Sequence, residues 1–227
     1  MRRRAAAYPR RVRPDHRVPP RLHPDGGPLA EQLAALPPSC GPVRLVAVDG
    51  HAGSGKTTLA GRLAAALGDA PVLHLDDLAN HEQFFTWTPR LRQQVLAPLR
   101  RGEPATVAVY DWERRAYTGV RTVPPAPVVL VEGVGAGRRA LRPHLAGLLW
   151  LEVDRGVAWR RGRRRDGPGL AAFWDAWVRA ETEHFADDPS RPHADLLVRP
   201  CPTAVPRGRE VLAGYEVLAG PRAADTT

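Results

Sequence analysis

The amino-acid sequence predicts an α/β domain, in which a mostly parallel, five-stranded sheet carries helices on both of its faces. Three observations support this fold class. Short apolar segments rich in β-branched residues alternate with segments of helical spacing, as in parallel sheets. A glycine-rich turn joins the first of these strands directly to the first helix. The length of 227 residues, 43% of them hydrophobic, suits one such domain.

The expected strands are the short, continuous apolar segments. They lie at residues 43–48, 71–75, 105–110, 128–131 and 148–153, with a candidate last strand at 194–198. The expected helices lie at residues 57–67, 91–99, 155–165 and 170–185, and Pro98 is expected to end or kink the second of them. The intervening residues 79–88 and 112–127 are expected to be loops.

The two ends of the chain differ from this pattern. Residues 1–40 contain eight Arg and three acidic residues and show no apolar period, which predicts a disordered tail with one candidate helical piece at 28–36. The domain is therefore expected to span residues 41–199, and residues 200–227, rich in Pro and Gly, to form a loosely packed tail. More than half of the formal net charge of +9 lies in the first tail, so nucleic-acid binding by the domain is not expected.

The sequence also bears on the compartment. No apolar run reaches the roughly 20 residues that cross a bilayer, and no apolar stretch of a secretory signal follows the basic N-terminus. We therefore expect a cytoplasmic protein with no membrane partner. The sequence is compatible with a homo-oligomer.

The turn after the first strand has the sequence GHAGSGKT at residues 50–57, which fits the pattern G-x-x-x-x-G-K-[ST]. Glycines let backbone N–H groups converge on phosphates, and the positive end of the following helix faces the same anion. Lys56, the single Lys of the chain, supplies a point charge, and the Thr57 hydroxyl suits Mg²⁺. The residues expected to bind the triphosphate of ATP are Gly50, Gly53, Ser54, Gly55, Lys56, Thr57 and Thr58.

Carboxylates follow two of the expected strands. Asp76 and Asp77 end the second strand, where one carboxylate can accept the proton of an acceptor hydroxyl or share a metal ion. The alternative is an acidic pair that makes a turn or caps a helix. Glu132 follows the fourth strand, which suits a second metal-associated carboxylate, with a surface acid as the alternative. Ligands of parallel sheets bind at the carboxyl ends of strands, so both positions lie near the expected phosphate site.

Basic and aromatic side chains follow these acids along the sequence. Residues 160–165 contain five Arg, and one or two of them are expected to close over the transferring phosphate as a lid while the others face solvent. Aromatic residues after the second and third strands either line an acceptor pocket or serve in ordinary packing. These are Phe84, Phe85, Trp87, Tyr110, Trp112 and Tyr117. Trp174 and Trp177 are interpreted as packing residues, and His51 is assigned no role.

With these motifs, the chain from about residue 43 to 198 resembles the uridine kinase branch of the P-loop kinases, which also includes phosphoribulokinase-like and pantothenate kinase-like enzymes. The supporting motifs are the loop at 50–57, Asp-Asp-Leu at 76–78, Tyr-Asp-Trp at 110–112, Glu-Gly at 132–133, Asp154 before the Arg run, and His-Ala-Asp at 193–195. The resemblance implies a three-layer P-loop NTPase fold with an Arg-rich lid. It also implies an ATP-dependent phosphotransferase that transfers the γ-phosphate to an alcohol group of a small molecule, with ATP and Mg²⁺ as cofactors.

The resemblance further implies roles for single residues. Thr57, Asp76 and Glu132 match the positions that arrange Mg²⁺ in this family, and Asp76 also matches its general base. The other catalytic residues, which offset charge on the transferred group, are Lys56, Arg161 and Arg165.

The expected acceptor site departs from the family's pattern. Tyr110 matches an acceptor-site aromatic residue, and Trp112 and Arg115 complete the expected substrate site. Thr88 stands where uridine kinases place the Asp that holds ribose hydroxyls, and Arg115 stands where they carry a His. Uridine as the acceptor therefore does not follow. A kinase for another small metabolite, such as a sugar or a vitamin, is one alternative, and a non-catalytic ATP-binding regulatory protein is another. A GTPase would show an N-K-x-D motif, and the single Lys already lies in the loop.

Overall fold

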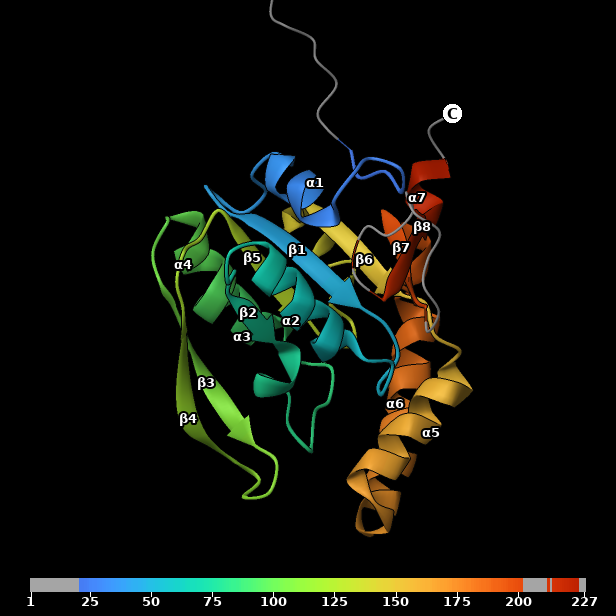
Figure 1. Cartoon of the computed structure of the whole chain (residues 1–227). Coiled ribbons are helices and arrows are strands. Elements are labelled where there is room, and N and C mark those ends of the chain that lie inside the picture. Colours follow the sequence, from blue (N-terminus) through green and yellow to red (C-terminus); the bar gives the residue numbers. More distant parts are fainter. Residues whose placement is uncertain (1–20, 202–211, 213, 225–227) are drawn as a thin grey trace, which may run out of the picture.

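The computed structural model describes residues 21–201, 212 and 214–224, and its centre is a six-stranded sheet (Figure 1). The strand order is β2-β5-β1-β6-β7-β8; the first five strands are parallel, and β8 is antiparallel to β7. The strands are β1 (Arg44–Asp49), β2 (Val72–His74), β5 (Val128–Glu132), β6 (Gly147–Leu151), β7 (Leu196–Pro200) and β8 (Tyr215–Ala219). The sheet is thus mostly parallel, as predicted, with one strand more than expected.

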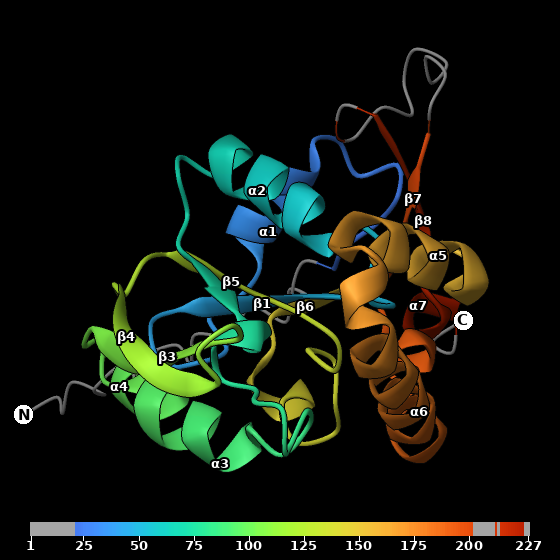
Figure 2. The same cartoon turned by 90° about the horizontal axis from the view of Figure 1, so that it is seen from below.

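Helices cover both faces of the sheet, which confirms the three-layer arrangement (Figure 2). On one face lie α1 (Leu29–Ala35) and α2 (Lys56–Ala66). On the other lie α3 (Thr88–Leu91), a π-helical turn (Arg92–Leu96) and α4 (Ala97–Arg100). The π turn replaces the kink expected at Pro98, which has no N–H to donate to an α-helical hydrogen bond.

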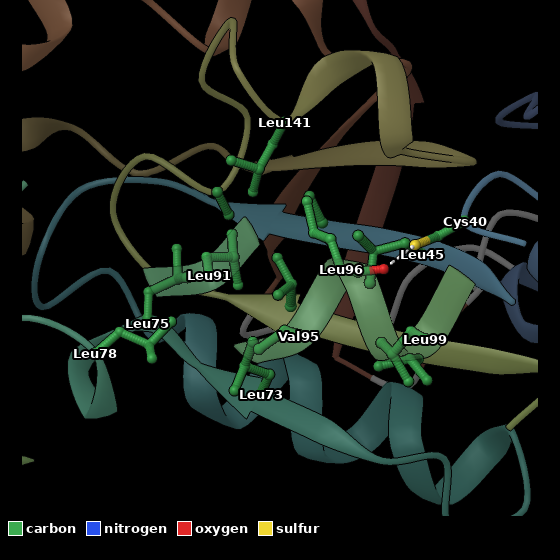
Figure 3. Close-up of a cluster of buried hydrophobic side chains, with 14 of the residues drawn as sticks. Cys40, Leu45, Leu73, Leu75, Leu78, Leu91, Val95, Leu96, Leu99 and Leu141 are labelled. Atoms are coloured by element: carbon green, nitrogen blue, oxygen red, sulfur yellow. Dashed lines mark hydrogen bonds between the residues drawn. The ribbon is translucent and has the colours of Figure 1, made fainter. Parts of the chain in front are cut away.

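The two faces of β1 contribute to two separate cores. Leu45 and Ala47 pack with the leucines of the α3–α4 side, a cluster shown in Figure 3, whereas Val46 and Val48 pack with those of α1 and α2. This burial on both faces explains why the strand appears as a continuous apolar segment.

Two further helices, α5 (Arg155–Asp166) and α6 (Ala171–Asp187), extend beyond the carboxyl ends of the strands (lower right of Figure 1). A short helix, α7 (Pro221–Ala224), follows β8. Single 3₁₀ turns occur at Leu75–Asp77, Arg142–His144, Pro168–Leu170 and Arg191–His193.

The third expected strand was placed wrongly. It is β3 (Ala105–Asp111), which pairs antiparallel with β4 (Ala116–Val123) in a separate two-stranded sheet. The prediction of a loop at 112–127 was also wrong over β4, whose residues are largely exposed and carry no apolar signal. In β3 the exposed Thr106 alternates with buried Ala105 and Val107, which is the pattern of a ribbon rather than of a central strand.

Both expected domain boundaries exclude residues that pack into the domain. Before residue 41, Leu29 and Leu33 of α1 are fully buried. After residue 199, Tyr215 and Val217 of β8 are buried against the same cluster. The composition of the Arg- and Pro-rich surroundings hid these short apolar pieces. Residues 1–20, for which disorder was predicted, lie outside the described residues.

Replacement of Leu33 by Ala tests whether α1 belongs to the folded domain. Since the side chain is fully buried, we expect a loss of about 2–5 kcal/mol in the free energy of unfolding, measured by urea denaturation. The exposed Glu31 of the same helix provides a control, and Glu31→Gln should change stability by no more than about 0.5 kcal/mol. Equal, small effects of both substitutions would contradict the packing of α1.

Candidate active site

The glycine-rich loop connects β1 to α2 at the carboxyl end of the sheet. β1 lies where the strand order reverses, because the chain next forms β2 on one side of it and later β6 on the other. Gly53 has a φ of 78°, and a Cβ there would lie 2.2 Å from the carbonyl oxygen of Ala158. Only glycine therefore lets α5 pack directly on the loop.

The loop places three kinds of group that suit a triphosphate. Lys56 is only 8% exposed, and its Nζ donates to the backbone oxygen of His51 at 3.0 Å. The buried hydroxyl of Ser54 has no hydrogen-bond partner among the residues that the structure describes. Thr57 and Thr58 are exposed in the first turn of α2, at the positive end of that helix. These groups fit the anionic ligand that the sequence predicts.

Two of the side chains predicted to arrange Mg²⁺ lie together beside the loop. The Thr57 hydroxyl donates to Glu132 Oε1 at 3.1 Å, and His74 Nδ1 lies 2.6 Å from the same oxygen. Burial acts to raise the pKa of Glu132, but the hydrogen bond with His74 and the charge of Lys56 lower it overall. Glu132 is therefore an anion at neutral pH, as a ligand of Mg²⁺ must be.

Asp76 lies across from this pair, in the 3₁₀ turn after β2. Its side chain reaches solvent, yet the protein atoms crowded around it, together with the negative charge on Glu132, raise its pKa. In the described part of the chain, no three His, Cys, Asp or Glu side chains converge as a metal site. Mg²⁺ would thus be held by few protein oxygens, as is common for this ion with phosphates and water.

The structure separates the two aspartates of the acidic pair. Asp77 Oδ2 lies 3.1 Å from Arg121 Nε of β4, an ion pair that joins the β3–β4 hairpin to the main body. Asp76 instead lies near the charges of Glu132 and Lys56. Asp77 is thus the member of the pair with an ion-pair partner, and Asp76 is the member near the charge of Lys56.

The arginines of α5 also take different directions. Arg165 forms an ion pair with Asp166 at 2.6 Å, which raises its pKa, and the carboxylate of Asp76 contributes to this rise. Arg163 pairs with Asp175 of α6 at 2.6 Å, and Arg161 is exposed one turn before Arg165. Of the two predicted lid arginines, the structure brings Arg165 within electrostatic reach of Asp76.

Aromatic side chains gather on the other side of Asp76. Trp112 Nε1 donates to the backbone oxygen of Asp76 at 3.2 Å, and the rings of Tyr110 and Trp112 are 5.2 Å apart. The Tyr110 hydroxyl lies 3.0 Å from His81 Nδ1. Six residues whose rings contact one another are called the aromatic cluster; its members are His81, Phe84, Tyr110, Trp112, Phe173 and Trp177.

Four other predicted residues are not members of this cluster. Phe85 stacks on the ring of His184, with 4.7 Å between the ring centres. Trp87 packs under the guanidinium of Arg138, 3.9 Å from its ring centre. Tyr117 lies under Arg90 at 3.8 Å and donates to Leu78. Arg115 is exposed in the β3–β4 turn. Burial lowers the pKa of His81 in the cluster, and the positive charge of Arg115 adds to this shift.

Sequence reasoning missed two buried carboxylates at the loop. Asp49, the last residue of β1, accepts hydrogen bonds from the backbone N–H groups of Gly50, Gly135 and Gly137 at 2.7, 3.0 and 2.8 Å. Asp49 thereby fixes the loop to the segment after β5. An acidic residue at the end of a strand was also the pattern that pointed to Glu132, and the same pattern could have pointed to Asp49. Glu181 of α6 contacts the loop from the opposite side.

A buried histidine makes the fold sensitive to acid. Burial, with the adjacent charge of Arg138, lowers the pKa of His184 from 6.5 to about 4, so the folded protein keeps it neutral while the unfolded chain binds a proton. The free energy of unfolding is not reduced by this group above about pH 6.5. As the pH falls toward 4, protonation of His184 in the unfolded chain lowers the free energy of unfolding by up to about 3 kcal/mol. Nearby acids oppose the shift; they are Asp188, Glu181 and Asp187.

Urea denaturation at pH 7 and pH 4.5 measures this loss. The variant His184→Gln cannot titrate, so it should lose less stability than the wild type between the two pH values. Identical losses in the two proteins would show that His184 does not carry the effect.

Comparison with known proteins identifies the fold. No protein-family profile matches the sequence, and no curated protein has a significantly similar one. Among solved structures, the chain is similar to a possible uridine kinase from Bacillus stearothermophilus, with 20% identity and a TM-score of 0.56, over 74% of this chain and 94% of that one.

Two other kinases align less well. A structure described as a fructose transport system kinase, from Silicibacter sp. TM1040, shares 23% identity over 65% of this chain and 80% of its own, with a TM-score of 0.44. Shikimate kinase from Bacteroides thetaiotaomicron shares 21% identity over 63% of this chain and 80% of its own, with a TM-score of 0.34.

The chain has the fold of the P-loop kinases. The resemblance to the uridine kinase branch, inferred from the motifs, is confirmed at the level of the fold.

Proposed function

We propose that the protein is an ATP-dependent small-molecule kinase, which transfers the γ-phosphate of ATP to a hydroxyl group. One observation carries the proposal: Lys56, the Thr57–Glu132 pair and Asp76 converge at the carboxyl ends of β1, β5 and β2. Lys56 and Thr57 follow β1, Glu132 ends β5 and Asp76 follows β2, so their convergence is not the result of a single local motif.

The roles follow from the positions of the residues. Lys56 moves from the carbonyl oxygen of His51 to phosphate oxygens, where its charge offsets that of the transferred group. Thr57 and Glu132, with Asp76, would supply the oxygens that hold Mg²⁺, which would offer positive charge to the phosphates. Asp76 orients the acceptor hydroxyl and accepts its proton, a role that the raised pKa of its carboxyl favours. Arg165 closes over the phosphate from α5, with Arg161 beside it.

The aromatic cluster is the proposed acceptor site, because it adjoins Asp76 and presents rings with few polar groups. Thr88, at the position of the family's ribose-binding Asp, already accepts a hydrogen bond from Arg138 at 2.6 Å. This contact weighs against uridine and favours another small hydroxyl compound, one with an apolar or aromatic part.

Of the described helices, none is both long and apolar enough to span a membrane.

The experiment is ATP consumption by the purified protein with Mg²⁺, against a panel of nucleosides, sugars, vitamins and small aromatic alcohols. ADP formation that depends on one acceptor is the expected result. Tight ATP binding with no acceptor-dependent turnover across the panel would favour the non-catalytic regulatory alternative instead.

A further inference from the structure

A fully buried carboxylate of α6 contacts the phosphate loop directly. Glu181 is 0% exposed, and its Oε1 lies 2.7 Å from the Nδ1 atom of His51, the second residue of the loop. Its Oε2 accepts a hydrogen bond from the backbone N–H of Ala52 at 3.2 Å. One side chain of α6 thus holds the conformation of the loop from outside. The two helices α5 and α6 are together called the lid.

The same carboxylate also joins the two lid helices. Trp159 of α5 donates its indole N–H to Oε1 of Glu181 at 3.1 Å, and Trp177 of α6 donates to Oε2 at 2.9 Å. Four donors from the loop, α5 and α6 therefore meet on a single group. Trp177 is also a member of the aromatic cluster, so Glu181 lies between the nucleotide side and the proposed acceptor side.

The charge of Glu181 is linked to the phosphate site. Hydrogen bonding with His51 and the positive charge of Lys56 lower the pKa of Glu181 against the effect of burial, so the group is ionised. Lys56 in turn donates to the backbone oxygen of His51. A movement of Lys56 toward phosphate therefore alters the contacts of the residue that Glu181 holds.

The surroundings leave room for such a change. A pocket of about 230 Å³ borders the side chains of His51, Trp159 and Glu181 on their outer side. The ring of His51 meets those of Trp150, Trp159 and Phe185 edge-on, at 5.4–6.0 Å between ring centres, and none of these contacts is covalent or ionic.

We propose that Glu181 is a positioning residue that couples the phosphate loop to α5 and α6, so that nucleotide binding at the loop orders the lid. The inference rests on the proposed function, since it assigns the loop to a nucleotide. Through Trp177 the same contact links the nucleotide to the acceptor side, and by linkage each substrate then tightens the binding of the other.

The test compares the full-length wild type with Glu181→Gln and with Glu183→Gln, an exposed acid of the same helix that serves as a matched control. Calorimetry gives the dissociation constant for the Mg²⁺ complex of a non-hydrolysable ATP analogue. Hydrogen exchange gives the protection of α5 and α6 with and without the analogue.

In the wild type and in Glu183→Gln, the analogue should slow exchange in the loop, in α5 and in α6 together. In Glu181→Gln, we expect protection of the loop alone and a dissociation constant about tenfold higher. A residue with a purely structural role would instead change exchange equally with and without the analogue.

If Glu181→Gln does not fold, Trp159→Phe keeps the ring and removes one donor. It should raise the dissociation constant about threefold and weaken the protection of α5. Full nucleotide-dependent protection of both helices in a folded Glu181→Gln protein would overturn the inference and leave the proposed function intact. Failure of the wild type to bind the analogue would instead overturn the proposed function.

Discussion

Replacement of Lys56 by Ala should lower phosphoryl transfer by on the order of a thousandfold. Lys56 is the single Lys of the chain and is 8% exposed, so a negative charge beside it meets little screening by water. Lys56→Arg should not restore activity, since a planar guanidinium is larger than the ammonium group.

The measurement is acceptor-dependent ADP formation, together with the dissociation constant for ATP. Arg101→Ala removes a positive charge at a surface ion pair with Glu103 and should leave both quantities unchanged. Unchanged turnover in the Lys56→Ala variant would exclude the proposed mechanism.

Replacement of Asp76 by Asn should lower kcat by about 10²- to 10⁴-fold, because the amide keeps the shape of the side chain and cannot accept the proton. Asp77→Asn is the matched control within the same turn. It breaks only the ion pair with Arg121 and should change kcat by less than about fivefold. Rates measured at saturating ATP and acceptor separate the loss of chemistry from a loss of binding.

Equal losses in the two variants would mean that the turn acts through its structure and not through the Asp76 carboxylate. A rise in the Mg²⁺ concentration needed for activity, specific to Asp76→Asn, would indicate that Asp76 also holds the metal ion.

The sequence allowed the central part of the fold to be predicted, because the strands around the loop are buried on both faces and contain few polar residues. β1, β5 and β6 were identified in this way. The strands buried on one side only were harder to place. β3 looked like a central strand, β4 was hidden by its exposed polar residues, and β8 is a short apolar segment within a Pro- and Gly-rich tail. An apolar segment does not reveal which neighbour it pairs with, and that is decided by packing.

The candidate site residues also fall into those that the sequence pointed to and those that it did not. Lys56, Thr57, Asp76 and Glu132 were identified because the loop pattern and the strand ends place them, and the structure brings them together. Glu181 could not be identified, since Glu183 two positions later is also acidic and nothing local distinguishes the buried one from the exposed one.

The β3–β4 hairpin forms a sheet of its own, and among the described residues neither strand pairs with the central sheet. It contributes Tyr110 and Trp112 to the aromatic cluster and is joined to the turn after β2 by the Asp77–Arg121 ion pair. Such a hairpin can be exchanged without breaking a hydrogen bond of the six central strands. On the proposed function, a change confined to this hairpin would alter the acceptor site and leave the phosphate loop in place.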